Sequence, residues 1–213
     1  MRKYTFLGGV FAAAALLNGC STTTTIYDPA SVKTGIRQDR AVSSEEYREV
    51  AAVAVKGAMT NVKFNTFLRQ YKQEMNDADA IPVLKLDRVI NDTDDPDLNA
   101  SELTDMINEE LLNAGKVDVT MAEGAGRTGA IAASRELAND DNFDQSTVAK
   151  RGTLQAARLV LRPKVISNTV RDGSKKAVVR TFVMEMADIK TGRIIWKFSK
   201  QLGYMKERGT FGW

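Results

Sequence analysis

Apolar residues between positions 43 and 75 recur mostly at intervals of three and four, which predicts helical structure. Ser43 begins the sequence Ser-Ser-Glu-Glu, a capping-box pattern that opens a helix. A break is possible near Asn61, so the segment forms either one long helix or two consecutive helices. The next segment, Ile81–Ile90, is dense in branched aliphatic residues and is predicted to be the first strand.

Further helices are predicted in the central part of the chain. A polar loop, Asn91–Leu98, leads into a helix at Ala100–Ala114, which has an apolar stripe and a C-terminal cap at Gly115. The other predicted elements are a short strand at Val117–Met121 and two helices at Ile131–Leu137 and Val148–Ala157.

The last part of the chain has the pattern of an antiparallel meander. Three strands are predicted at Leu159–Val170, Ala177–Asp188 and Ile194–Leu202, joined by turns at 171–174 and 190–193. Apolar side chains alternate along two of these strands, on a face made by Phe182, Met184 and Met186 and a face made by Ile194, Trp196 and Phe198. These elements predict an α+β fold, in which helices pack against a mixed, largely antiparallel sheet.

Composition narrows the class of protein. The 213 residues are 43% hydrophobic and 27% charged, which fits one globular domain with a short appendage. Because the sequence has no histidine, it contains no Ser/His/Asp or Cys/His triad and no histidine-bearing zinc site. Its single cysteine excludes an internal disulfide and a multi-cysteine metal site. We therefore expect a protein that is not an enzyme, with no catalytic residue, metal or cofactor.

The first twenty residues resemble the signal peptide of a bacterial lipoprotein. Two basic residues precede an apolar run, Phe6–Leu17, which has the length of a signal-peptide core and is too short to span a bilayer. The sequence Leu17–Cys20 resembles the lipobox, in which the cysteine becomes the new N-terminus and carries the lipid. We predict a signal peptide at 1–19 and lipidation of Cys20; the alternative is a secreted protein with a chance cysteine.

The residues after the lipobox indicate the membrane in which the protein is anchored and the distance that its tether can span. Serine at position 21, in place of aspartate, resembles the outer-membrane address of Gram-negative lipoproteins, so we expect a lipid anchor in that membrane with the protein facing the periplasm. Residues 20–42, rich in Thr and Ser, are predicted to be the lipidated N-terminus and a tether that spans at most about 75 Å, and residues 43–213 the globular domain. Without residues 1–19 the chain has 28 basic and 27 acidic residues, so it lacks the positive field that binds nucleic acid.

A glycine motif suggests nucleotide binding but lacks the context for it. Residues Gly124–Gly129 match GxGxxG and follow a short predicted strand. A Rossmann unit also needs a second parallel strand that ends in an acidic residue about 20 positions on, and Asp144 stands there in polar sequence without a strand. We therefore expect a flexible loop that enters a helix.

Clustered carboxylates are predicted to be solvated. An EF-hand loop counted from Asp92 would need glycine at position 97 and glutamate at position 103, where the sequence has Asp97 and Leu103. We therefore expect no calcium site. The acidic loop is expected to be solvated and to lead into the N-terminus of the next helix, where negative charge is favourable. The loop carboxylates are those of Asp92, Asp94, Asp95 and Asp97, and the adjacent helical pairs are Glu45/Glu46 and Glu109/Glu110. The aromatic and charged tail, Tyr204–Trp213, either binds a partner or covers the sheet edge.

Three stretches together resemble the LpoB family of outer-membrane lipoproteins, which activate penicillin-binding proteins: Pro82–Thr93, Asp97–Thr120 and Val183–Lys197. The last is the most specific, a strand, a Thr-Gly turn and a strand with Ile-Ile-Trp. The resemblance implies a fold similar to the N-terminal domain of TolB, no catalytic residue, and a docking domain of a bifunctional peptidoglycan synthase as the partner.

One departure from the family leaves an alternative open. Members that reach an inner-membrane synthase are expected to use a long proline-rich tether, whereas residues 21–42 contain one proline, Pro29. The first hypothesis is a lipid-anchored activator of a penicillin-binding protein that regulates cell-wall synthesis. The alternative is a non-catalytic structural component of an envelope or secretion assembly, which the short tether favours. An enzyme that uses serine, lysine or carboxylates is the weakest possibility.

Overall fold

Two consecutive helices, α1 (Ser44–Thr60) and α2 (Val62–Met75), open the part of the chain that the computed structural model describes. That part comprises residues 44–95, 98–127, 129–172 and 175–207, all within one unit that covers residues 34–213. The predicted break is confirmed, because the Asn61 side chain accepts hydrogen bonds from the backbone of Lys63 and Phe64 and starts a new helix. Ser43, the predicted cap of α1, lies outside the described residues.

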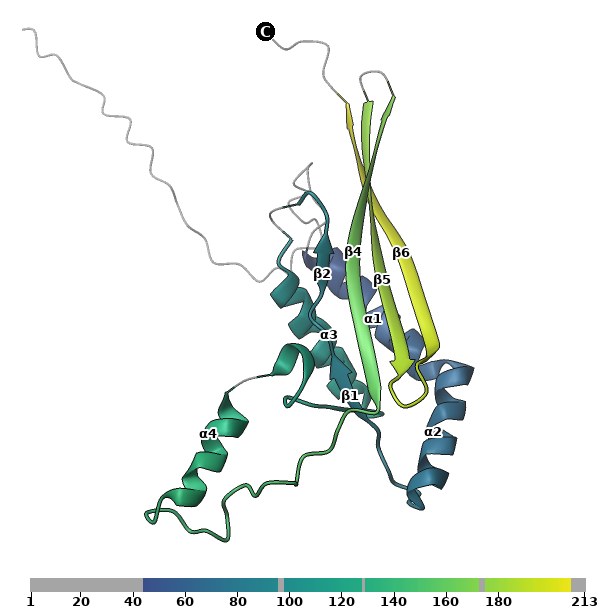
Figure 1. Ribbon diagram of the computed structural model, residues 1–213. Coiled ribbons are helices and arrows are strands. Elements are labelled where there is room, and N and C mark those ends of the chain that lie inside the picture. The colour runs from purple at the N-terminus through teal and green to yellow at the C-terminus, as the bar shows by residue number, and fades with distance from the viewer. Residues whose placement is uncertain (1–43, 96–97, 128, 173–174, 208–213) are drawn as a thin grey trace, which may run out of the picture. The chain divides into compact units, whose positions relative to one another are not determined.

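A mixed sheet forms the other layer (Figure 1). The strands are β1 (Val83–Leu86), β2 (Ile90–Asp92), β3 (Asp118–Val119), β4 (Leu159–Asp172), β5 (Lys175–Asp188) and β6 (Arg193–Glu207). Their order is β3-β1-β4-β5-β6, with β2 also paired to β4. The three short strands are parallel to their neighbours, whereas β4, β5 and β6 form the predicted antiparallel meander. The α+β fold class is confirmed.

The helices α1, α2 and α3 (Ala100–Ala114) bury the core against one face of the sheet. The predicted C-terminal cap of α3 is confirmed, because Gly115 ends the helix in the left-handed conformation with a φ of 63°. At the other end the Asn99 side chain caps the first turn, which the sequence analysis did not identify. The predicted apolar face of β5 is also confirmed, because its three side chains are fully buried: Phe182, Met184 and Met186.

The first predicted strand is divided in two. Residues 87–89 interrupt it, and the chain then pairs again with β4 as β2. The interruption lies beside Pro163 of β4, which has no N–H to donate to a neighbouring strand. The Val89 N–H, outside the sheet here, donates instead to the Thr104 hydroxyl of α3 at 3.0 Å.

The predicted inward face of the last strand is wrong at its first residue. A β-bulge shifts the pairing register between β5 and β6, so that Met186 lies opposite Trp196 but Ala187 lies opposite Ile194. The extra residue in β6 turns Ile194 to the other face, where it is 54% exposed, while Trp196 stays buried. The alternation of side chains therefore restarts at the bulge.

The connection from β3 to β4 holds one predicted helix and lacks another. The short helix α4 (Ala130–Glu136) lies between two single turns of 3-10 helix, η2 (Gly124–Gly126) and η3 (Leu137–Asn139). The helix predicted at Val148–Ala157 is absent: these residues form turns and irregular structure, and Gly152 has a φ of 82°. Leu154, which would belong to its apolar stripe, is 49% exposed. In the part of the chain described here, no helix is long and apolar enough to span a membrane.

Candidate functional site

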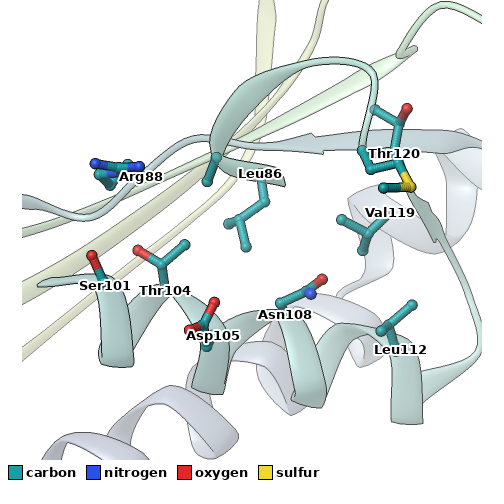
Figure 2. A pocket seen from close by; sticks show the side chains of 11 residues that line it. Leu86, Arg88, Ser101, Thr104, Asp105, Asn108, Leu112, Val119 and Thr120 are labelled. Atoms are coloured by element: carbon teal, nitrogen blue, oxygen red, sulfur yellow. The ribbon is translucent and has the colours of Figure 1, made fainter. Parts of the chain in front are cut away.

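The described domain has a polar cleft of about 160 Å³ between α3 and the strands β1 and β3 (Figure 2). The residues that give it its chemistry are Leu86, Arg88, Thr104, Asp105, Asn108 and Thr120. Figure 2 shows Leu86 of β1 directed toward α3, on which Thr104, Asp105 and Asn108 lie. The buried Oδ1 atom of Asn108 has no hydrogen-bond partner among the described residues, so the cleft can accept a polar donor.

The most buried hydroxyl of the cleft is held by the backbone. The Thr104 hydroxyl, its most buried nucleophile, donates to the Ala100 carbonyl at 2.6 Å and accepts from the Val89 N–H at 3.0 Å. It is therefore committed to the backbone and is not paired with a base. Among the residues with described positions, no group of three His, Cys, Asp or Glu side chains could hold a metal ion.

The acidic loop is anchored to the sheet, contrary to the prediction of a solvated loop. Asp95 is 7% exposed and forms a buried ion pair with Arg180 of β5, which is 3% exposed. Asp92 and Asp94 are exposed as predicted, and Asp94 also accepts a hydrogen bond from the Ser167 hydroxyl of β4 at 3.3 Å. Since Asp97 lies outside the described residues, the prediction is wrong at Asp95 alone.

The same ion pair also contacts α1 through a tyrosine. Burial raises the pKa of the Tyr47 hydroxyl, and the nearby Arg180 guanidinium only partly offsets this effect. Tyr47 therefore stays neutral and brings a polar atom to the buried charges. The pair joins three segments: α1, β5 and the loop between β2 and α3.

A second ionic cluster joins α2 to the hairpin of β5 and β6. The Arg158 guanidinium donates from Nε to Asp188 at 2.7 Å and from Nη1 to Glu74 of α2 at 2.9 Å. It also lies over the rings of Phe67 and Tyr71, at 5.5 and 5.8 Å from their centroids. Arg158 is thus held on several sides, which indicates a structural role.

Hydrogen bonds set the charge states in this cluster. Burial alone raises the pKa of Asp188, but hydrogen bonds from Arg158 and Thr191 outweigh it, so this pKa lies below its ordinary value. Hydrogen bonds from Lys190 and Arg158 also lower the pKa of Glu74. Both carboxylates are therefore ionised at neutral pH and hold the cationic side chains in place.

The sheet face opposite the helices carries charged side chains in a row. Glu185 of β5 lies between Arg162 of β4 at 3.9 Å and Lys197 of β6 at 3.6 Å. The side chains of Arg162 and Lys197 are 59% and 60% exposed, so these pairs contribute little stability. Lys164, one step along β4 on the same face, is also exposed. The charged side chains at 162, 164 and 197 are accessible to a partner, whereas Thr181 and Val183 on the same face of β5 are buried.

Packing explains the first glycine of the GxGxxG motif. Gly124 has a φ of 71°, and a Cβ atom there would lie 2.3 Å from the carbonyl oxygen of Leu86 in β1. The motif leads into α4 after Gly129, as predicted, but its first residue is packed against a strand. Asp144 accepts a hydrogen bond from the Ser146 N–H and follows no strand; the next strand begins at Leu159. The context of a dinucleotide site is missing.

The other predicted residues are separate from the cleft. Of the paired glutamates, Glu45, Glu46 and Glu109 are exposed, and Glu109 forms a surface ion pair with Arg48 at 3.4 Å. The first residues of the predicted tail continue β6 as far as Glu207, and the rest lie outside the described residues. Cys20 and the predicted tether lie outside them too, so lipidation stays a prediction. The ion pairs of Asp95 and Arg158 were missed because their partners are far apart in sequence.

Comparison with known proteins gives the family. A family model described as "Peptidoglycan-synthase activator LpoB" matches residues 46–202. A search of curated proteins finds no match. Among solved structures, the LpoB C-terminal domain from Salmonella enterica is similar at 21% identity, with 70% of this chain and 97% of that chain covered and a TM-score of 0.34. The same domain from Escherichia coli has 20% identity, the same coverages and a TM-score of 0.35. A lipoprotein from Neisseria meningitidis, GNA1162, has 13% identity, coverages of 61% and 87%, and a TM-score of 0.32. Since the family match spans most of the chain, this chain belongs to the LpoB family of peptidoglycan-synthase activators.

Proposed function

We propose that this chain is an outer-membrane lipoprotein that binds a bifunctional peptidoglycan synthase of the penicillin-binding protein class and stimulates it by direct contact. The observation that carries the proposal is the family match over residues 46–202, which includes α2, α3 and all but the first two residues of α1. An activator of this kind regulates cell-wall synthesis and needs a binding surface rather than catalytic residues.

The chemistry of the described domain supports an activator that is not itself an enzyme. The hydroxyl of Thr104 in the cleft is bonded to the backbone, and the ionic cluster around Arg158 holds structural elements together. Exposed charged side chains on the sheet and a polar cleft are accessible, and both are suited to contact with a protein.

The sequence supports the anchor and the location. The lipobox-like sequence ending at Cys20 provides the lipid attachment, and Ser21 favours sorting to the outer membrane, with the domain in the periplasm. The first described helix begins at Ser44, so little more than 20 residues separate it from the anchor. Fully extended, such a segment spans about 75 Å.

This limited reach favours one alternative, a non-catalytic structural component of an envelope or secretion assembly. A protein of that kind would use the same fold and anchor but would stay near the outer membrane. It would bind assembly proteins and leave the rate of glycan synthesis unchanged. Crosslinking in native envelopes followed by identification of the captured proteins distinguishes the two functions.

A polymerisation assay tests the proposal. A purified bifunctional synthase from the native organism is supplied with lipid-linked precursor, and glycan formation is followed as the full-length protein is titrated in detergent. We expect the rate to rise and to saturate near one molecule of protein per synthase. A Cys20→Ala variant should stimulate equally in detergent, because the contact belongs to the globular domain. Binding without stimulation, or no binding, would contradict the activator function.

A further inference from the structure

The connection between β3 and β4 forms a cavity of about 510 Å³. Its wall comes from α4, η3 and residues 145–151, and no described residue lines both this cavity and the cleft beside α3. Sites that bind small molecules commonly have volumes of about 300 to 1,000 Å³. The cavity therefore has room for a ligand larger than a water molecule or a simple ion.

The wall of this cavity is positively charged. Its ionisable side chains, among those whose positions are described, are all basic: Arg135, Lys150 and Arg151. None of the three forms an ion pair with another described residue. The Nε atom of Arg135 is buried and has no hydrogen-bond partner within the described structure. Because a buried donor without a partner is unfavourable, an anion in the cavity would supply an acceptor that the protein lacks.

The carboxylates of the same connection do not neutralise these cations by direct contact. They lie outside the described wall of the cavity and belong to Glu136, Asp140, Asp141 and Asp144. The Asp140 carboxylate accepts a hydrogen bond from the Asn142 N–H at 3.0 Å, and the Asp144 carboxylate accepts one from the Ser146 N–H at 2.9 Å. These two carboxylates hold turns in place, so the basic side chains are left for a ligand.

A glutamine side chain holds the two parts of the wall together. The Nε2 atom of Gln145 donates hydrogen bonds to the carbonyl of Leu137 in η3 at 3.3 Å and to the carbonyl of Asp140 at 2.9 Å. The end of η3 is thereby tied to the segment that leads to Lys150 and Arg151. A wall that is fixed before binding reduces the entropy that a ligand loses to order it.

The composition of the wall selects an anion with more than one negative charge. Guanidinium groups bind carboxylate and phosphate through paired hydrogen bonds, and a lysine ammonium adds a further positive charge. A single carboxylate would balance one of the three cations, whereas a phosphate or pyrophosphate group carries more charge and more acceptor oxygens. The described wall contains no glycine of the GxGxxG motif, so the cavity is separate from that motif.

We infer that the cavity bordered by Arg135, Lys150 and Arg151 binds a phosphate-bearing ligand that carries two or more negative charges. The phosphate belongs either to a free compound or to the headgroup of an anionic lipid, since both present the same chemistry to the wall. The inference goes beyond the proposed function and does not depend on it, because contact with a synthase is no part of the argument.

The first test uses the full-length protein in detergent, with pyrophosphate as the ligand and acetate as a singly charged control. Calorimetry measures the affinity, and the Nε–H signal of Arg135 in a nitrogen–proton correlation spectrum reports contact with the anion. We expect pyrophosphate to saturate at one molecule per chain and to shift this signal, and acetate at the same concentration to do neither. Added salt should weaken the binding, because it screens the basic wall.

A second test distinguishes the two sources of the phosphate. The same spectrum is recorded in micelles that contain phosphatidic acid, whose phosphomonoester can carry two charges, and in control micelles with singly charged phosphatidylglycerol. A shift of the Arg135 signal with phosphatidic acid but not with pyrophosphate would identify a lipid headgroup as the ligand. A shift with pyrophosphate but not with phosphatidic acid would identify a free compound. Either result supports the site.

Three variants separate the cavity from general positive charge. Arg135→Gln removes a side chain that has no partner in the described structure, so it should fold normally and bind pyrophosphate at least about tenfold more weakly. Ala138→Glu adds a carboxylate to the wall at an exposed position and should weaken binding by a similar factor. The matched control is Arg127→Gln, which removes an exposed arginine of the same connection outside the wall and should keep the original affinity. Circular dichroism confirms that each variant is folded.

Several results would overturn the inference. These are the absence of a shift with both pyrophosphate and phosphatidic acid, equal binding of acetate and pyrophosphate, and a loss of affinity in Arg127→Gln as large as in Arg135→Gln. Stimulation of a synthase together with any of these results would leave the proposed function standing while the inference fails. Binding of pyrophosphate by a protein that binds no synthase would have the opposite meaning.

Discussion

The buried ion pair between Asp95 and Arg180 gives the sharpest prediction about stability. Asp95→Asn keeps the shape of the side chain and removes its charge, so the buried Arg180 guanidinium loses its ion pair with this carboxylate. The two side chains are 7% and 3% exposed, and solvent therefore cannot replace the missing carboxylate. The loop before α3 should lose its main contact with β5.

The expected cost follows from this burial. Removal of one partner from a buried ion pair costs about 3 to 5 kcal/mol. Asparagine retains an oxygen that accepts a hydrogen bond, so we expect a value near the lower limit, about 3 kcal/mol. Arg180→Met should cost about as much, because it leaves the Asp95 carboxylate buried. The double variant should lose no more than either single variant, since each one already breaks the pair.

Urea unfolding followed by circular dichroism measures these changes. With a urea dependence of about 2 kcal/mol per molar, a loss of 3 kcal/mol lowers the unfolding midpoint by about 1.5 M. Arg162→Met is the matched control, because it removes the same side chain from an exposed pair and should cost less than about 1 kcal/mol. A loss below about 1 kcal/mol in Asp95→Asn, or additive losses in the double variant, would show that the buried ion pair does not stabilise the fold.

Three further predictions concern pH, packing and the anchor. The pKa of Asp188 is depressed in the folded state. Its contribution to stability is therefore present above the ordinary carboxyl pKa of about 3.9 and is lost as the pH falls through the folded value. Between about pH 5 and about pH 2, Asp188→Asn should lose less stability than the wild type in acid unfolding, and equal losses would contradict this. Gly124→Ala places a Cβ atom 2.3 Å from the carbonyl oxygen of Leu86, whereas Gly152 has a similar positive φ but open space around it. Gly124→Ala should therefore lower the melting temperature more than Gly152→Ala. Equal decreases would show that the contact with Leu86 does not limit the residue at position 124. Cys20→Ala should abolish incorporation of labelled fatty acid and release the protein from the membrane fraction, and a variant that stays in the membrane would disprove the lipid anchor.

Local patterns in the sequence were sufficient where an element is specified by its own residues. The helix at about Ala100–Ala114 was predicted correctly because its apolar stripe is regular and Gly115 ends it. The meander was predicted for the same reason, since its apolar residues alternate between clear turns. The helix at Val148–Ala157 was wrong because a few apolar residues at helical spacing do not make a helix without a face to bury.

Features that depend on contacts between distant residues could not be predicted. The burial of Asp95 depends on Arg180, which is 85 residues away, so the local sequence shows only an acidic loop. The outward turn of Ile194 depends on a register shift against β5. The cleft beside α3 combines residues from separate elements, each unremarkable in its own segment. Sites of this kind can be identified only once the pairing of the strands is known.

The rate of glycan polymerisation by a purified bifunctional synthase, measured with and without this protein, shows whether the chain is an activator. An activator should cause a saturable increase in rate that persists in Cys20→Ala and is absent when the protein is unfolded beforehand. An unchanged rate at concentrations where the protein demonstrably binds the synthase would contradict activation and leave a structural role in the envelope.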